Sequence, residues 1–180
     1  MTERVEEIPV VDVNKIRIRR MTREDLPQLE WNGEFIHFRN VYKNVYQRMQ
    51  HGTSEAWVAE TPQAEIIGQV FLQLESDRPE LADGWNRAYL YSFRIKAPYR
   101  NRGLGTSMLQ VLEDFLIARH FTRLTLNVAR DNPDAIRLYK RHGFQIVAEE
   151  PGIWSYIDHE GQWKTVRSEE HTSELQSPNT

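Results

Sequence analysis

The sequence predicts an α/β domain in which helices flank a mixed sheet. Runs rich in β-branched and aromatic residues, which favour strands, recur along the chain. Between them lie runs whose apolar residues return at helical spacing, so strands and helices are interspersed. With 180 residues and 39% hydrophobic content, the chain suits one domain that buries roughly two-thirds of its unfolded surface.

The amino-terminal part of the domain is predicted to contain a strand and two helices. Residues 15–20 alternate between polar and apolar, as a strand with one solvated face does. Thr22 and Asp25 have the spacing of a capping box, which would begin a helix that runs to about Trp31. A second helix fits residues 38–50 and ends near a glycine. Its apolar side would consist of Tyr42, Val45, Tyr46 and Met49.

Three further strands are predicted before the middle of the chain. Residues 56–60 and 66–74 would pair antiparallel around a turn at residues 61–64. A loop over residues 75–86, which contains proline, aspartate and glycine, leads into a fourth strand at residues 88–95. The stretch that follows this strand carries the strongest functional signal.

The segment Arg-Asn-Arg-Gly-Leu-Gly-Thr, residues 100–106, joins the fourth strand to a helix. Gly103 and Gly105 would let the backbone approach a ligand, and the first N–H groups of the helix are unpaired at the positive end of its dipole. A pyrophosphate fits this geometry, and Arg100 and Arg102 would add charge-assisted hydrogen bonds. Taken alone, the spacing also fits a tight turn with two solvated arginines. The helix is indicated by apolar residues on one face, Leu104, Met108, Leu112 and Phe115.

A second strand-to-helix unit follows the first. Residues 124–128 form the fifth predicted strand, and Asn132 or Asp131 can cap a helix whose first turn holds Pro133. Gly143 suits the C-terminal end of that helix. Two late strands complete the pattern, at residues 144–148 and 153–157.

Together, the two units resemble the GCN5-related N-acetyltransferase (GNAT) superfamily. The first matches its acetyl-CoA motif, Arg/Gln-x-x-Gly-x-Gly/Ala after the fourth strand, and the second matches its pattern Asn-x-x-Ala-x-x-Leu-Tyr-x-x-x-Gly-Phe at residues 132–144. The resemblance runs from Lys15 to about Ile157. It implies a central, twisted, mostly antiparallel sheet with splayed parallel strands 4 and 5. It also implies direct transfer of an acetyl group from acetyl-CoA to a primary amine of a small molecule or peptide within a ternary complex.

The resemblance also implies which residues hold the acetyl donor. Backbone N–H groups at residues 102–106 would bind the CoA pyrophosphate with Arg100 alongside, and the backbone of Phe93 and Ile95 would pair with the pantetheine arm. Asn132 would bind the pantetheine, although the same side chain also suits a simple helix cap. The full set of predicted acetyl-CoA-binding residues is Phe93, Ile95, Arg100, Asn101, Arg102, Gly103, Leu104, Gly105, Thr106 and Asn132.

Catalysis requires an acid for the departing thiolate and a route for the amine proton. The resemblance places the phenol of Tyr139 near the sulfur, where a protonated phenol can donate; from residue type alone, Tyr139 also fits a core aromatic. Many relatives carry a glutamate on the fourth strand, but residues 89–92 are Tyr-Leu-Tyr-Ser. An ordered-water route is therefore predicted. Glu34 and His37 are further candidates for the base, although each also fits an ordinary surface position.

The sequence does not specify the acceptor, and two classes of function fit it. One is an acetyl-CoA-dependent N-acetyltransferase, which the presence of Tyr139 favours; the other is a non-catalytic acyl-CoA sensor on the same fold, for which the missing strand glutamate leaves room. A generic nucleotide binder is disfavoured, because no acidic residue follows the glycines at the ribose-binding distance. The aromatic residues that could line an acceptor cleft are Trp31, Phe35, Phe38, Tyr42, Tyr91 and Trp154.

Composition limits the cofactors, partners and cellular location expected for the protein. It has no cysteine, which excludes disulfides and a thiol nucleophile, and its six histidines show no metal-ligand spacing, so no metal is expected. The formal net charge of -3 argues against a nucleic-acid partner. No apolar run reaches membrane-spanning length, and the amino terminus lacks a signal-peptide core. The expectation is a cytoplasmic monomer or homodimer without a membrane partner.

Both ends of the chain fall outside the predicted domain, which covers residues 15–166. Residues 1–14 form a leader whose order the sequence leaves open. Residues 167–180 begin Arg-Ser-Glu-Glu-His-Thr-Ser-Glu-Leu-Gln-Ser, which resembles the in-frame translation of a common sequencing-library adapter. A non-native tail is therefore predicted, and a polar disordered tail is the alternative. The seventh strand of the family would then be cut short or replaced by residues 161–166.

Overall fold

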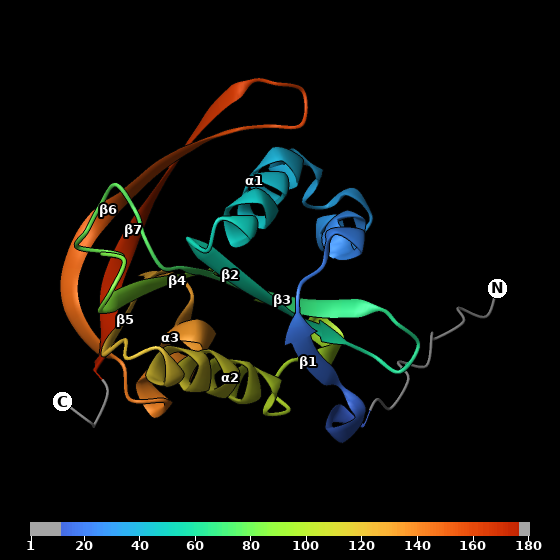
Figure 1. The fold of residues 1–180 in the computed structure, drawn as a ribbon, viewed down its shortest axis with the longest axis horizontal. Helices are drawn as coiled ribbons and strands as arrows, with labels where there is room; N and C mark the ends of the chain where they lie inside the picture. The colour runs from blue at the N-terminus through green and yellow to red at the C-terminus, as the bar shows by residue number, and fades with distance from the viewer. Residues whose placement is uncertain (1–11, 177–180) are drawn as a thin grey trace.

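The computed structural model describes residues 12–176. Within this range the strands form one seven-stranded sheet in the order β1-β2-β3-β4-β5-β7-β6. All neighbours are antiparallel except β4 and β5, which are parallel. The predicted mixed, mostly antiparallel sheet is confirmed (Figure 1). The strands are β1 (Arg17–Arg20), β2 (Ser54–Glu60), β3 (Ile66–Gln73), β4 (Arg87–Ile95), β5 (Arg123–Ala129), β6 (Gln145–Ile157) and β7 (Trp163–Gln176).

Helices cover both faces of the sheet. In Figure 1, α1 lies on one side of the sheet and α2 and α3 lie on the other. Most of the predicted leader lies outside the described residues, and its last part belongs to η1. The α-helices are α1 (Arg39–Gln50), α2 (Leu104–Ala118) and α3 (Pro133–Arg141), and the 3₁₀-helices are η1 (Val13–Lys15), η2 (Arg23–Gly33), η3 (Ile36–Phe38) and η4 (Ala97–Tyr99).

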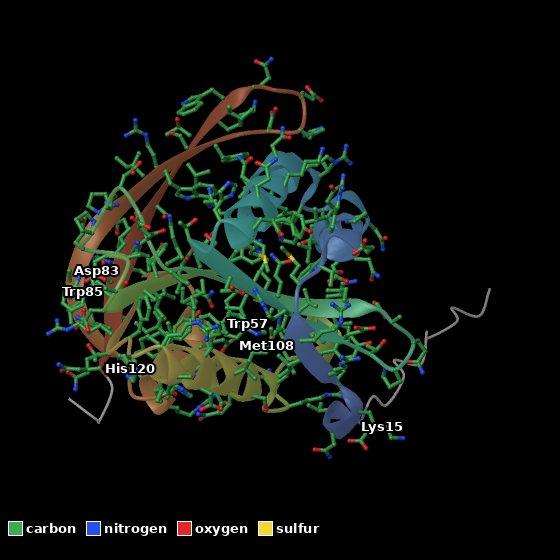
Figure 2. All side chains as sticks on the ribbon, viewed as in Figure 1. Lys15, Trp57, Asp83, Trp85, Met108 and His120 are labelled. Atoms are coloured by element: carbon green, nitrogen blue, oxygen red, sulfur yellow. The ribbon has the colours of Figure 1, made fainter. Side chains whose placement is uncertain are left out.

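Alternation along β2 divides the core into two apolar layers. Ala56 and Val58 belong to the layer under α1, where Tyr42 is buried. Trp57 belongs to the layer under α2, and Figure 2 shows it with Met108 between the sheet and that helix. The two layers pack against opposite faces of the central strands, including β4.

The first helical segment begins where the sequence predicts, but its form differs. The backbone N–H of Thr22 donates to Asp25 Oδ2 at 2.7 Å, which confirms the capping box. The segment is a 3₁₀-helix, and Pro27 within it supplies no N–H for a regular helical ladder. Trp31 and Asn32 then adopt positive φ angles of 46° and 56°, which ends the helix close to the predicted position.

The late strands are longer than predicted. β6 is one continuous strand rather than two, and it pairs with β7 from Gln145 to Ile157. The two predicted strands stop at residue 148 and begin again at residue 153, and Pro151 and Gly152 lie between them. Because β6 lies at the edge of the sheet, one of its sides needs no hydrogen-bond partner, and a proline is tolerated there.

β7 also differs from the expectation of a strand cut short near residue 166. It continues to Gln176, and its residues 170–176 pair with β5. The strand is mostly polar, and Ser173 is its one buried side chain. Main-chain pairing uses groups that nearly every residue carries, so the pairing does not reveal where residues 167–180 come from. Their adapter origin stays a prediction.

Candidate active site

A separation between two parallel strands lies at the centre of the site. Residues 87–90 of β4 pair with residues 123–126 of β5, and the pairing ends there. β4 continues to Ile95 and β5 to Ala129, so the two strands splay apart as predicted. Beyond the splay, the edge of β4 that faced β5 has no strand partner among the described residues. Its main-chain groups can pair with an extended ligand.

A β-bulge in β4 decides which way its side chains face. Val70 of β3 lies opposite both Ser92 and Phe93, and Ser92 has a φ of 52°. Tyr91 packs in the layer under α1, whereas Phe93 packs in the layer under α2. Strict alternation would have placed these two rings on one face. The bulge therefore turns Arg94 toward the α1 face.

A cavity of about 470 Å³ lies on the α2 side of the splay and is called here the α2 cavity. Leu104 and Arg102 are not among its lining residues, and the side chain of Leu104 is buried in the core. Leu104 can therefore contribute only its backbone N–H, whereas the side chain of Arg102 is exposed next to two lining residues and its predicted role stays a prediction. The predicted donor-binding residues that line the cavity are Phe93, Ile95, Arg100, Asn101, Gly103, Gly105, Thr106 and Asn132.

The start of α2 forms one wall of the α2 cavity. Gly103 precedes the helix with a φ of 84°, and no described side chain caps the N–H groups of the first turn, so these remain available to an anion. A Cβ on Gly105 would lie 3.0 Å from Leu138 Cδ2, so the close approach of α2 and α3 requires glycine there. Arg100 is positioned by a 2.7 Å hydrogen bond from its Nε to the carbonyl of Ile95.

Helix α3 supplies the last two predicted residues. Asn132 Oδ1 accepts a 3.2 Å hydrogen bond from the N–H of Ala135, so Asn132 caps the helix and also lines the cavity. Tyr139 is buried against Phe144, with ring centroids 5.5 Å apart, and lies 6.5 Å from Phe93. It lines the cavity, and its hydroxyl makes no hydrogen bond with a described residue. Burial raises the pKa of Tyr139, so the phenol stays protonated at neutral pH.

A second cavity, of about 460 Å³, lies on the α1 side of β4 and is called here the α1 cavity. Residues of α1, β4 and β6 line it. Two of the aromatic residues that could line an acceptor cleft, Trp31 and Phe35, line the α2 cavity. The expected aromatic residues that do line the α1 cavity are Phe38, Tyr42, Tyr91 and Trp154.

A pair of stacked tyrosines lines the α1 cavity on β4. The rings of Tyr89 and Tyr91 lie 5.7 Å apart and nearly parallel, and both line the α1 cavity. Asn127 Nδ2 donates to the Tyr89 hydroxyl at 3.3 Å, while burial raises the pKa of Tyr89 to about 12. Tyr89 is also close enough to Tyr139 to contribute to the raised pKa of Tyr139. The two cavities meet at Arg94, which lines both, so a group at that end of the α1 cavity would lie beside the α2 cavity.

The structure separates the two candidate bases. Glu34 lines the α2 cavity together with Tyr139, and its side chain is exposed to solvent. His37 lines neither cavity; it packs against Phe38 with ring centroids 4.1 Å apart. Burial, followed by the charge of Arg94, lowers the pKa of His37. Glu34 is thus the candidate that the fold brings to the site.

Arg94 is a residue of the site to which no role was assigned from its sequence context. It lines both cavities, and no other described residue that lines one of them also lines the other. Its signal in the sequence is a single charge inside an otherwise apolar strand end, which is typical of a solvated residue. Because the bulge at Ser92 cannot be seen in the alternation of residue types, the side chain's inward direction could not be predicted.

The comparison with protein families identifies the class of protein. The chain matches the model of the acetyltransferase (GNAT) family over residues 18–144. It therefore belongs to the GNAT family of acetyltransferases.

Two curated relatives carry the name N-acetyltransferase. An uncharacterized N-acetyltransferase of Bacillus subtilis, YycN, is 27% identical over 89 residues, which cover 49% of this chain and 54% of that protein. The probable N-acetyltransferase san of Drosophila melanogaster is 27% identical over 94 residues, 52% of this chain and 48% of that protein. The chain spans about half the length of the curated relatives it matches.

Solved structures share the fold over nearly the whole chain. Arabidopsis thaliana NAA60, solved with a bisubstrate analogue, is 22% identical to this chain and superposes with a TM-score of 0.68. The superposition covers 92% of this chain and 99% of the NAA60 chain. The same protein was solved with acetyl-CoA, at a TM-score of 0.67 over 89% of this chain and 98% of its own. The spermidine/spermine N-acetyltransferase SpeG of Vibrio cholerae is 17% identical, with a TM-score of 0.65 over 91% of this chain and 94% of its own. At these identities the likeness supports the fold alone.

A helix must be both long and apolar to cross a bilayer. The helices in question are those within residues 12–176. None of them meets both requirements for crossing a membrane.

Proposed function

We propose that this protein is an acetyl-CoA-dependent N-acetyltransferase that acetylates a primary amine of a small molecule or peptide by direct attack in a ternary complex. The observation that carries the proposal is the pair of cavities on either side of the β4–β5 splay, with Tyr139 in one and Tyr89 in the other. Two cavities that approach each other allow donor and acceptor to bind at the same time. The structural neighbour solved with acetyl-CoA supports the choice of donor.

The α2 cavity has groups that suit the pyrophosphate and the pantetheine arm of acetyl-CoA. The uncapped N–H groups at the start of α2 suit the pyrophosphate. Arg100 already donates Nε to the carbonyl of Ile95, so its other N–H groups are the ones directed to phosphate. The unpaired edge of β4 at Phe93 suits the amides of the pantetheine arm, and Asn132 lines the same cavity.

Acetyl transfer forms a C–N bond to the amine and breaks the C–S bond of the thioester. The amine loses a proton in this process, and the sulfur gains one. Tyr139 donates its proton to the sulfur as the C–S bond breaks and recovers a proton from water. The products are an N-acetylated amine and the free thiol of CoA.

The amine proton leaves by ordered water, with Glu34 as the side chain that can receive it. β4 has no carboxylate or imidazole in the position where many relatives carry glutamate. Glu34 lines the same cavity as Tyr139, and its exposure lets it pass a proton to solvent. His37 is the weaker candidate, because it lines neither cavity.

The competing function is a non-catalytic acyl-CoA sensor, which the absence of a strand-borne base favours. The test is to measure acetyl-CoA binding by calorimetry and CoA thiol release with a panel of primary amines. Amine-dependent release, with an N-acetyl product of equal amount by mass spectrometry, is expected of the enzyme. Binding without release from any amine would identify a sensor. Absence of binding would reject the assignment of the donor site itself.

A further inference from the structure

We propose that Arg94 anchors an anionic group of the acceptor, and that the acceptor is a primary amine that also carries a carboxylate, as an amino acid does. This inference rests on the proposed function, because it concerns the amine that enters the α1 cavity. Its starting point is position: Arg94 lines both cavities. A group bound to Arg94 therefore lies beside the place where amine and thioester must meet.

The guanidinium of Arg94 is held in place by neutral groups. Nη1 donates to the Tyr42 hydroxyl at 3.2 Å and to Ser92 Oγ at 3.1 Å. The guanidinium carbon lies 4.3 Å from the ring centroid of Phe35 and 5.2 Å from that of Phe38. These contacts orient the side chain without neutralising its charge.

One edge of the guanidinium has no protein partner among the described residues. Both hydrogen bonds start at Nη1. The edge formed by Nε and Nη2 is the one that can donate two parallel hydrogen bonds to a carboxylate. Glu34 acts on Arg94 only through its charge, without a salt bridge. Burial lowers the pKa of Arg94, which reflects the poor solvation of a charge that a ligand carboxylate would compensate.

The anion must belong to the acceptor rather than to the donor. The phosphates of acetyl-CoA belong at the start of α2, while the thioester end is uncharged. The other charged side chains that line the α1 cavity are Arg78 and Glu170. The aromatic walls formed by Phe38 and Tyr42 suit an apolar body. The chemistry that fits is an amino carboxylate with an apolar side chain.

The test compares amino acids with their α-carboxamides as acceptors, in the wild-type chain and in Arg94→Gln. The carboxamide keeps the amine and the side chain but removes the charge. We expect Arg94→Gln to lower kcat/KM for the acid about 10- to 100-fold more than for the amide, the effect of losing a charged, paired hydrogen bond. A general loss of active protein cancels in this ratio.

Two further variants control the comparison. Arg94→Lys keeps the positive charge but loses the planar guanidinium that donates two parallel hydrogen bonds, so an intermediate change in the acid-to-amide ratio of kcat/KM is expected. If Arg94→Gln does not fold, Arg94→Lys takes its place in the test. Arg39→Gln removes an arginine of α1 that pairs with Glu30 and lines neither cavity, so the ratio should equal that of the wild type.

Peptides that begin with glutamate or glutamine form a second matched pair. If Arg94→Gln lowers kcat/KM more for the glutamate peptide than for the glutamine peptide, and acids and amides respond equally, Arg94 still anchors a carboxylate. That carboxylate then belongs to a side chain of the acceptor. If Arg94→Gln lowers both members of each pair by the same factor, Arg94 only shapes the fold and the inference is overturned. If the wild-type chain binds acetyl-CoA and releases no thiol with any amine, the proposed function fails and this inference with it.

Discussion

Replacing Tyr139 with phenylalanine should separate catalysis from stability. The Tyr139 hydroxyl makes no hydrogen bond with a described residue, so its removal leaves no protein group unpaired. The free energy of unfolding should therefore change by less than about 1 kcal/mol. A positioned general acid typically contributes about 10²- to 10⁴-fold, so kcat for thiol release should fall by that factor, equivalent to about 3 to 5 kcal/mol in activation free energy. The dissociation constant for acetyl-CoA should stay unchanged.

The measurements are thiol-release kinetics, calorimetry with acetyl-CoA and urea denaturation on the same preparations. Phe121→Leu is the matched control, because it removes buried apolar volume from the same layer and lines neither cavity. It should lower the free energy of unfolding by about 1 to 2 kcal/mol and leave kcat unchanged. A Tyr139→Phe protein with wild-type kcat would refute the role of acid. A loss of several kcal/mol in stability would show that the hydroxyl has a structural partner.

Three other predictions follow from the geometry. Gly105→Val should weaken acetyl-CoA binding at least about tenfold, because even a Cβ at this position would lie 3.0 Å from Leu138 Cδ2 and valine adds two methyl groups beyond it. Calorimetry showing unchanged affinity would contradict this. Asp25→Asn should lower the free energy of unfolding by about 1 to 3 kcal/mol at pH 7, since it weakens the capping box and the ion pair with Arg19. Burial alone would raise the pKa of Asp25, but hydrogen bonds from Arg19 and Thr22 hold it below its usual value. The contribution of Asp25 to the free energy of unfolding is therefore present above about pH 4 and is lost as pH falls through the folded pKa. A difference in stability between wild type and Asp25→Asn that does not shrink in acid would count against the ion pair. Sequencing the gene from source DNA should give a different continuation after Val166, and finding codons for residues 167–176 there would end the adapter hypothesis.

The elements that the sequence predicted well are those with local signals. The capping box at Thr22, the Asn132 cap with Pro133, and the helix face of α2 depend on neighbours within a turn or two. The predicted donor-binding residues, by contrast, were assigned largely from the resemblance to the GNAT superfamily; most lie at the junction of β4 and α2, and Asn132 lies between β5 and α3. Their roles in binding remain predictions.

The features that could not be predicted depend on distant pairing. Ser92 gives no sign of the bulge that turns Arg94 inward, because the bulge is set by the register against β3. Pro151 lies between the two late strands that the sequence predicts, and only the position of β6 at the sheet edge makes this proline compatible with one continuous strand. The same limit applies to β7, whose polar residues carry little pattern and whose extent depends on β5 and β6.

The central claim is direct transfer between two molecules held together at the β4–β5 splay. Initial rates measured while acetyl-CoA and an active amine are varied together test it most directly. A ternary complex predicts double-reciprocal lines that intersect, with no acetylated protein detected by mass spectrometry after incubation with acetyl-CoA alone. Parallel lines together with a stable acetyl-protein would contradict the account, because they would require the chain to carry the acetyl group itself.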